Sequence, residues 1–169
     1  MKIRVSKTTA VIAIFIIISA SFARQVMNYI KANFGEKGFA VLIGSVFIIS
    51  FSLFLFFIIK NSFNFLKTLL EISLLFLGLI LTWQIKLPEE KIHILEYAVL
   101  GWFSCRDLIK VNLRTKGTIL ASVFCIAIGL LDEIFQAILP YRFFQFRDIA
   151  LNSLGGSWGV ILYSLRLKK

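Results

Sequence analysis

The stretch DEIFQAILPYRFFQFRDIALNSLGGSWG, residues Asp132–Gly159, carries charged and amide side chains between segments that are otherwise strongly apolar. Two adjacent acids open the stretch, two arginines and a further Asp and Asn follow, and closely spaced glycines end it. Ionisable groups at membrane depth are unfavourable and persist mainly where they face a protein interior or a water-filled cavity. The stretch therefore predicts a polar site inside a membrane-spanning chain.

The composition indicates one integral membrane domain covering residues 1–169. Hydrophobic residues make up 59% of the chain, 18 residues are Phe, and the mean hydropathy of +0.87 is far above that of soluble domains. The net charge of +10 comes from Lys and Arg residues that lie singly or in small groups between the apolar runs. Basic residues are distributed in this way when they set membrane topology, whereas a nucleic-acid site clusters them on one face. We therefore expect no nucleic-acid partner.

The apolar runs predict an all-α integral membrane protein, a bundle of about six transmembrane helices. The expected helices cover about residues 8–29, 38–59, 65–85, 92–108, 117–139 and 148–165. A run of about 20 residues crosses a hydrocarbon core of about 30 Å. The first run has two interpretations. It is either a retained helix, which we favour because further spans follow, or a signal peptide cleaved after Ala23, which would leave five helices.

Three groups of polar residues, far apart in the sequence, are expected at one face of the membrane. They begin the fourth helix, end the fifth and begin the sixth, so that all flank loops that emerge on the same side of a six-span chain. Their members are His93, Glu96 and Tyr97; Asp132, Glu133 and Gln136; and Asp148 and Asn152. With cytoplasmic termini, twelve Lys and Arg residues lie inside and seven outside. This bias favours that orientation and puts the three groups in the outer leaflet of the cell membrane.

These residues resemble the pattern of the VanZ-like family of small membrane proteins, which is named for a protein of glycopeptide-resistance clusters. The family has a His followed four residues later by Tyr and then Leu-Gly. Asp-Glu-x-x-Gln, Pro-x-Arg, Asp, Asn and spaced glycines follow. The matching residues here are His93, Tyr97, Leu100, Gly101, Asp132, Glu133, Gln136, Pro140, Arg142, Asp148, Asn152, Gly155 and Gly159. The match covers roughly residues 90–159. It departs from the pattern at Lys91, which stands two residues before the His instead of three.

The resemblance implies a multi-pass protein of the cell envelope. Members of the family are linked to reduced susceptibility to teicoplanin-type glycopeptides, and many others occur outside resistance clusters. Glu96 before Tyr97 resembles a variant found near exosortase systems.

One interpretation of the polar groups is a binding site for a membrane lipid or a lipid-linked envelope precursor. Arg142 and Arg147 would hold an anionic headgroup, since a guanidinium matches phosphate and carboxylate geometry. The other candidate ligand contacts are Glu96, Tyr97, Gln136, Asp148 and Asn152. The small residues Gly155, Gly156 and Gly159 are expected at a close helix contact instead.

The alternative is a membrane-embedded hydrolase or transferase that acts on a lipid-linked substrate by acid/base chemistry. His93 or Glu133 would be the general acid or base, and Asp132 would orient it. No activated nucleophile is evident, and no residue pair has familiar metal-ligand spacing, so we predict no metal site. The sequence indicates no cofactor. Transport is disfavoured because no inverted repeat is visible, and Cys105 and Cys125 are expected to pack in the core.

Overall fold

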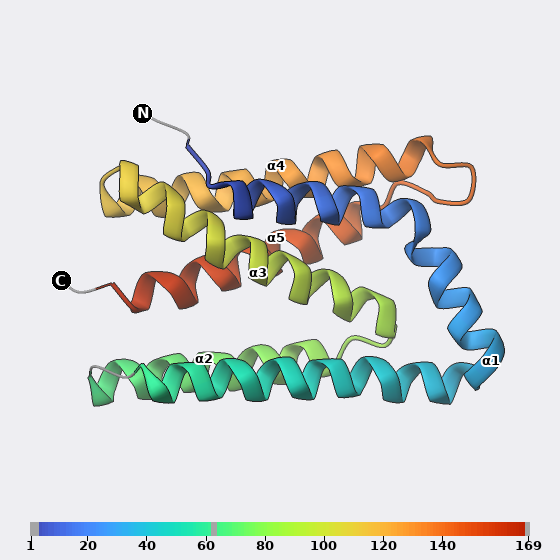
Figure 1. The fold of residues 1–169 in the computed structure, drawn as a ribbon, viewed down its shortest axis with the longest axis horizontal. Coiled ribbons are helices and arrows are strands. Elements are labelled where there is room, and N and C mark those ends of the chain that lie inside the picture. The colour runs from blue at the N-terminus through green and yellow to red at the C-terminus, as the bar shows by residue number, and fades with distance from the viewer. Residues whose placement is uncertain (1–3, 62–63, 168–169) are drawn as a thin grey trace.

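The computed structural model describes residues 4–61 and 64–167, apart from the side chain of Glu89. These residues form five α-helices and no strand (Figure 1). The helices are α1 (Lys7–Lys60), α2 (Phe65–Trp83), α3 (Pro88–Val111), α4 (Arg114–Ile138) and α5 (Phe146–Leu165). The expected all-α class is confirmed. The structure has five helices instead of the expected six, because α1 covers both of the first two predicted segments, which meet at a kink with non-helical backbone at Gly35.

The element α1 consists of two helical parts that meet at a kink at Gly35, and it therefore reverses its direction. Its first part runs along the bundle, its middle crosses one end, and its last part returns in the opposite direction (Figure 1). The return begins at Gly35, where φ is 70° and ψ is 172°. This backbone region is essentially restricted to glycine. The turn of α1 therefore depends on the absence of a side chain at Gly35.

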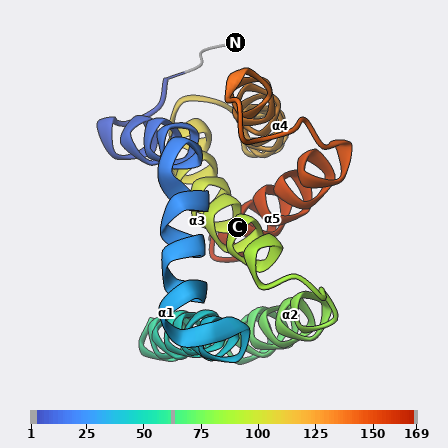
Figure 2. The ribbon, with the colours of Figure 1, turned by 90° about the vertical axis from the view of Figure 1, so that its right-hand side faces the viewer.

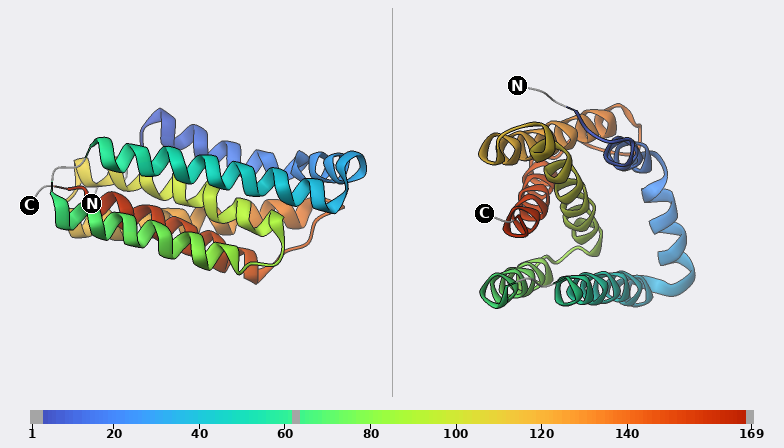
Figure 3. Two further views of the ribbon diagram at one scale, coloured as in Figure 1. Left: turned by 90° about the horizontal axis from the view of Figure 1, so that it is seen from below. Right: turned by 60° about the vertical axis from the view of Figure 1, so that its left-hand side comes forward.

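The helices form three layers (Figure 2). The first part of α1 and α4 make one outer layer, α3 and α5 the middle layer, and α2 with the last part of α1 the other outer layer. Seen from below, α2 and the returning part of α1 lie side by side across the rest of the bundle (Figure 3). Among the described residues, α1, α2 and α4 are long and apolar enough to cross a membrane. The helices α3 and α5 pack most extensively against each other.

Glycines allow this close approach of α5 to its neighbours. A Cβ atom on Gly155 would lie 2.5 Å from a main-chain carbonyl oxygen of α3, and one on Gly159 would collide with the carbonyl oxygen of Ala98. On α4, the Cβ of Cys125 would be 2.6 Å from a Cβ on Gly156. Small residues permit such approach of membrane helices. The predicted glycine surface therefore lies where α5 meets α3 and α4.

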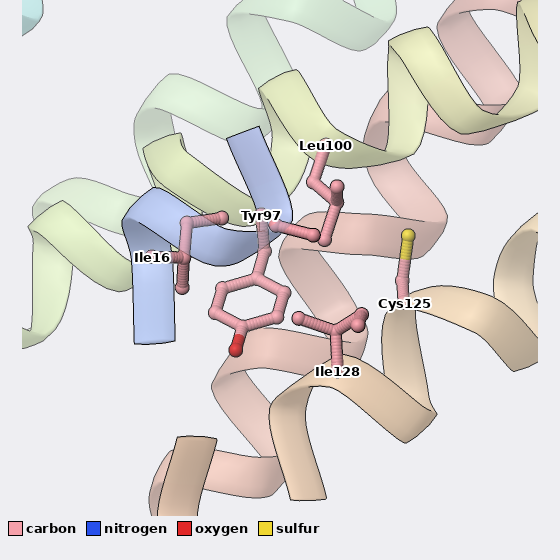
Figure 4. Close-up of a cluster of buried hydrophobic side chains, with 6 residues drawn as sticks. Ile16, Tyr97, Leu100, Cys125 and Ile128 are labelled. Atoms are coloured by element: carbon pink, nitrogen blue, oxygen red, sulfur yellow. The ribbon is translucent and has the colours of Figure 1, made fainter. Parts of the chain in front are cut away.

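The first part of α1 is built into the core. Figure 4 shows the ring of Tyr97 between side chains of α1 and α4, with its hydroxyl group pointing out of the apolar cluster. The buried members of this cluster are Ala13, Ile16, Tyr97, Leu100, Cys125 and Ile128. The α-helix continues through Ala23 without a break. Removal of residues 1–23 would therefore remove Ala13 and Ile16 from this buried cluster.

Each of the predicted polar groups lies at one end of the bundle. Pro88 begins α3 there, and α4 ends at Ile138, shortly before Pro140. The loops α2–α3 and α4–α5 emerge at this end, and the described ends of the chain lie at the opposite one (Figure 1). Three basic residues that favour cytoplasmic termini, Lys2, Lys168 and Lys169, lie outside the described residues.

Candidate functional site

A cavity of about 320 Å³ lies at the end of the bundle that carries the loops α2–α3 and α4–α5. Its walls come from α1, α3, α4, the α4–α5 loop and the first turn of α5. Five of the predicted site residues line it: His93, Glu96, Asp132, Arg142 and Asp148. The fold thus brings together side chains that the sequence separates by up to 55 positions.

Asp132 is a residue of the cavity lining and carries a carboxylate oxygen without a hydrogen-bond partner among the described residues. Its side chain is only 1% exposed, and its Oδ2 atom accepts a 3.4 Å hydrogen bond from the hydroxyl of Tyr97. Within the described residues, neither Oδ1 of Asp132 nor Nδ1 of His93 has a hydrogen-bond partner, although both atoms are buried. A buried polar atom without a partner is unfavourable by about 1–3 kcal/mol. Two residues of the cavity lining therefore each carry a buried polar atom without a partner in the described chain.

Behind the cavity, Glu133 and Gln136 form a network that holds the α4–α5 loop. Glu133 accepts from the main-chain N–H of Gln145 at 2.9 Å and from Nε2 of Gln136 at 3.0 Å. The Oε1 atom of Gln136 accepts from Nε of Arg142 at 2.8 Å and also from its Nη2. Glu133 and Gln136 are buried, and neither is among the described residues that line the cavity. Both carboxylate oxygens of Glu133 accept hydrogen bonds. Through Gln136, Glu133 helps to fix the position of the Arg142 side chain.

Arg147 and Asn152 lie outside the cavity lining of the described chain, unlike what the sequence suggested. The guanidinium of Arg147 is largely exposed and pairs with Glu90 of α3 at 2.9 Å. Asn152 is fully buried behind Gly129, where a Cβ atom would meet the Asn152 side chain at 3.1 Å. Arg147 thus ties the start of α5 to α3, and Asn152 lies at the contact of α4 with α5.

The wall formed by α1 was missed by the sequence interpretation. Arg24, Asn28 and Lys31 line the cavity from one helical face, with spacings of four and three residues. Nη1 of Arg24 donates to the carbonyl oxygen of Tyr141 at 2.8 Å, and the Tyr141 hydroxyl donates back to the carbonyl oxygen of Ser21. These two bonds fix α1 to the α4–α5 loop. The polar stripe on α1 was the signal in the sequence, but the same residues fit a topology signal equally well.

The cavity combines cations with acids. The positive charges are those of Arg24, Lys31 and Arg142. The acids are Glu90 and Glu96 of α3, Asp132 of α4 and Asp148 of α5. In the loop, burial lowers the pKa of the Arg142 guanidinium and the charge of Arg24 lowers it further, although nearby carboxylates oppose both effects. The described residues contain no group of three or more His, Cys, Asp or Glu side chains that could hold a metal ion. The lining therefore contains both donors for an anionic group and acceptors for a hydrogen-bond donor.

Comparison with protein families identifies one match. The family model described as VanZ/LLP1 matches residues 4–167, nearly the whole chain. No curated protein and no solved structure matches the chain. The family match extends beyond residues 90–159, so it includes α1 and α2 as well as the helices that carry the polar motifs.

Proposed function

The chain belongs to the VanZ/LLP1 family, and on this premise we propose that it is a multi-pass protein of the cell envelope whose cavity binds an anionic ligand. The ligand is a membrane lipid or a lipid-linked envelope precursor. The protein lies in the cell membrane with both termini in the cytoplasm, as the distribution of Lys and Arg favours. The cavity then opens towards the outer leaflet, where envelope precursors are used.

One observation supports the proposal above the others. Polar residues from α3, α4, the α4–α5 loop and α5 line one cavity, and two of their buried atoms lack partners in the described structure. Hydrogen bonds between membrane helices contribute only about 0.6 kcal/mol on average. Packing alone is therefore a poor explanation for unpaired polar atoms at Asp132 and His93, whereas a ligand supplies what they lack.

Through this ligand, the protein changes susceptibility to teicoplanin-type glycopeptides. A protein that binds an envelope precursor at the outer leaflet alters how much of it is accessible to an antibiotic. Arg142 holds the anionic group in this proposal, and Asp132 and His93 fix its orientation.

A membrane-embedded enzyme is the second candidate, and the free atoms of His93 and Asp132 favour it. An imidazole and a carboxylate in one cavity can exchange a proton with a bound lipid-linked substrate. Glu133 then acts through Arg142 and the loop, because its own oxygens are engaged. Such a hydrolase or transferase also fits an exosortase-associated system.

Single substitutions test the proposal. The variants His93→Gln, Asp132→Asn, Glu133→Gln and Arg142→Gln are each expressed in a susceptible host, and membrane insertion is checked by immunoblot. Each should abolish the teicoplanin phenotype. The control Lys110→Gln, an exposed residue near the opposite end of α3, should preserve it. If all four site variants retain the full phenotype, the site proposal is wrong.

The purified protein separates the two candidates. Incubation with envelope lipids, followed by mass spectrometry, should show a bound lipid that remains unchanged. Turnover that disappears in His93→Gln, while the bound lipid is retained, would favour the enzyme.

A further inference from the structure

Two guanidinium groups meet at the cavity from different parts of the chain. Arg142 belongs to the α4–α5 loop and Arg24 to α1, and both line the cavity. Arg24 donates to the main-chain carbonyl of Tyr141, the residue directly before Arg142, so the two arginines are fixed to the same short segment. Their proximity is also evident in the pKa of Arg142, which burial lowers first and the charge of Arg24 lowers next.

The hydrogen-bond partners of both arginines are neutral. Arg24 donates to a peptide carbonyl oxygen, and the side chain of Arg142 donates to the amide oxygen of Gln136. In the described part of the chain, neither forms an ion pair with a carboxylate within 4.0 Å. The two like charges repel each other, and the nearby carboxylates of Asp132, Glu133 and Asp148 offset only part of this effect at Arg142, whose pKa remains lowered. An anion between them would remove this repulsion and accept several donors at once.

Two other residues of the cavity lining have the opposite requirement. Oδ1 of Asp132 is an acceptor without a donor among the described residues, and Nδ1 of His93 is also unpaired there. A ligand that satisfies both requirements carries an anionic group and, close to it, a hydroxyl or ammonium group.

We propose that Arg24 and Arg142 together form a phosphate receptor, and that the ligand is a phosphate ester whose neighbouring hydroxyl or ammonium group bonds to Asp132 and His93. The inference rests on the proposed function and defines the chemistry of its ligand. Each guanidinium has further N–H groups besides those that donate to Gln136 and Tyr141, and a phosphate offers them several oxygens, whereas a carboxylate offers two.

The size and lining of the cavity agree with a headgroup. A volume of about 320 Å³ is near the lower limit of small-molecule pockets, about 300–1,000 Å³. Before Arg24, the lining of α1 consists mostly of small and apolar residues, among them Ile16, Ala20 and Ala23. The phosphate therefore lies beside an apolar wall, along which a lipid chain can continue. A free phosphate ester would use the same receptor without this wall.

Calorimetric titration of the full-length protein in detergent micelles tests the receptor. The soluble probes are sn-glycerol 3-phosphate and O-phosphoethanolamine, and the lipid probes are short-chain phosphatidylglycerol and phosphatidylethanolamine. Glycerol and ethanolamine serve as phosphate-free controls, and N-acetylalanine is the carboxylate probe. Phosphate probes should bind, and the phosphate-free controls should not. Binding of the lipid probes alone supports a lipid source, and binding of the soluble probes as well supports recognition of the headgroup.

The arginine variants decide which groups hold the phosphate. Arg24→Gln and Arg142→Gln should each weaken phosphate binding about tenfold or more, as expected when a charge-assisted hydrogen bond of about 1.5–3 kcal/mol is lost. Arg24→Lys, which keeps the charge but not the fork, should give an intermediate loss. Arg114→Gln is the matched control, because Arg114 donates to a main-chain carbonyl, that of Ser164, at 2.7 Å but lies outside the cavity lining of the described chain. It should bind within twofold of the wild type.

Three results would overturn the inference. If Arg24→Gln binds phosphate as the wild type does, Arg24 is not part of the receptor. If phosphate-free controls bind as tightly, phosphate is not recognised. If only the carboxylate probe binds, and Arg142→Gln loses it, the phosphate inference fails while the proposed anionic ligand stands. Absence of binding by every anion would reject both.

Discussion

Replacing Gln136 by Leu is expected to lower the free energy of unfolding by about 2–3 kcal/mol. The Gln136 side chain donates to Glu133 and accepts twice from Arg142. A hydrogen bond between membrane helices contributes about 0.6 kcal/mol on average, and one to a charged group in soluble proteins about 1.5–3 kcal/mol. At about 0.6–1.5 kcal/mol for each bond, the three bonds together give about 2–4.5 kcal/mol. The two bonds that share one oxygen count for less than two, so the expected loss lies in the lower half.

A double-mutant cycle measures the interaction itself. Unfolding is followed by circular dichroism in mixed micelles for the wild type, Gln136→Leu, Arg142→Leu and the double variant. In the described structure, two side-chain hydrogen bonds of Arg142 end on Gln136, so the coupling energy should be about 1–2 kcal/mol. Gln25→Leu, an exposed amide on α1, is the control and should change stability by less than about 0.5 kcal/mol. A coupling energy near zero would refute the network, as would a control that loses as much stability as Gln136→Leu.

Three further substitutions test the fold that carries the site. Gly35→Ala should destabilise by about 1–3 kcal/mol through the backbone alone, because no atom lies within 4 Å of a Cβ there; the same unfolding titration measures it, and an unchanged midpoint would contradict the turn. Gly159→Leu should separate α5 from α3 at Ala98, so this variant should elute as aggregated protein in size-exclusion chromatography; elution like the wild type would argue against the contact. Asp107→Ala removes the acceptor of Thr9, whose hydroxyl donates at 2.5 Å, and should release the start of α1 to proteolysis, whereas wild-type resistance would argue against this anchor.

Much of the bundle follows from elementary sequence signals. Predicted boundaries for the last four helices lie within a few residues of those observed, because long apolar runs fill these helices and Pro140 follows the end of α4. The predicted start of α3 at about residue 92 is late, because Pro88 occupies its first position. The position of the polar groups at one end of the bundle also follows from the sequence. Helices that alternate in direction return loops to the same end, so residues next to alternate loops must lie near each other.

The helix count differs from the prediction because the two helical parts of α1 are joined at a single non-helical residue, Gly35. A glycine followed by Glu36 and Lys37 fits a loop between two helices. The sequence does not show that one residue is enough to make the connection. The role of Arg24 was hidden for a related reason. A basic residue after an apolar run is typical of a membrane boundary, and its contact with the α4–α5 loop exists only in three dimensions.

The adjacent acids show a second limit of spacing arguments. Asp132 and Glu133 are equivalent in the sequence, but their side chains point in different directions from α4. One lines the cavity, and the other bonds to Gln136 and Gln145 behind it. The difference arises from the course of the α4–α5 loop, which no helical period describes.

The most direct test is an experimental density map of the full chain in lipid nanodiscs prepared from its native membrane. In this map, the carboxylate of Asp132, the imidazole of His93 and the guanidinium of Arg142 should face one cavity, with density for a bound headgroup between them. A map in which His93 faces the lipid tails, or in which side chains fill the space between these three groups, would contradict it.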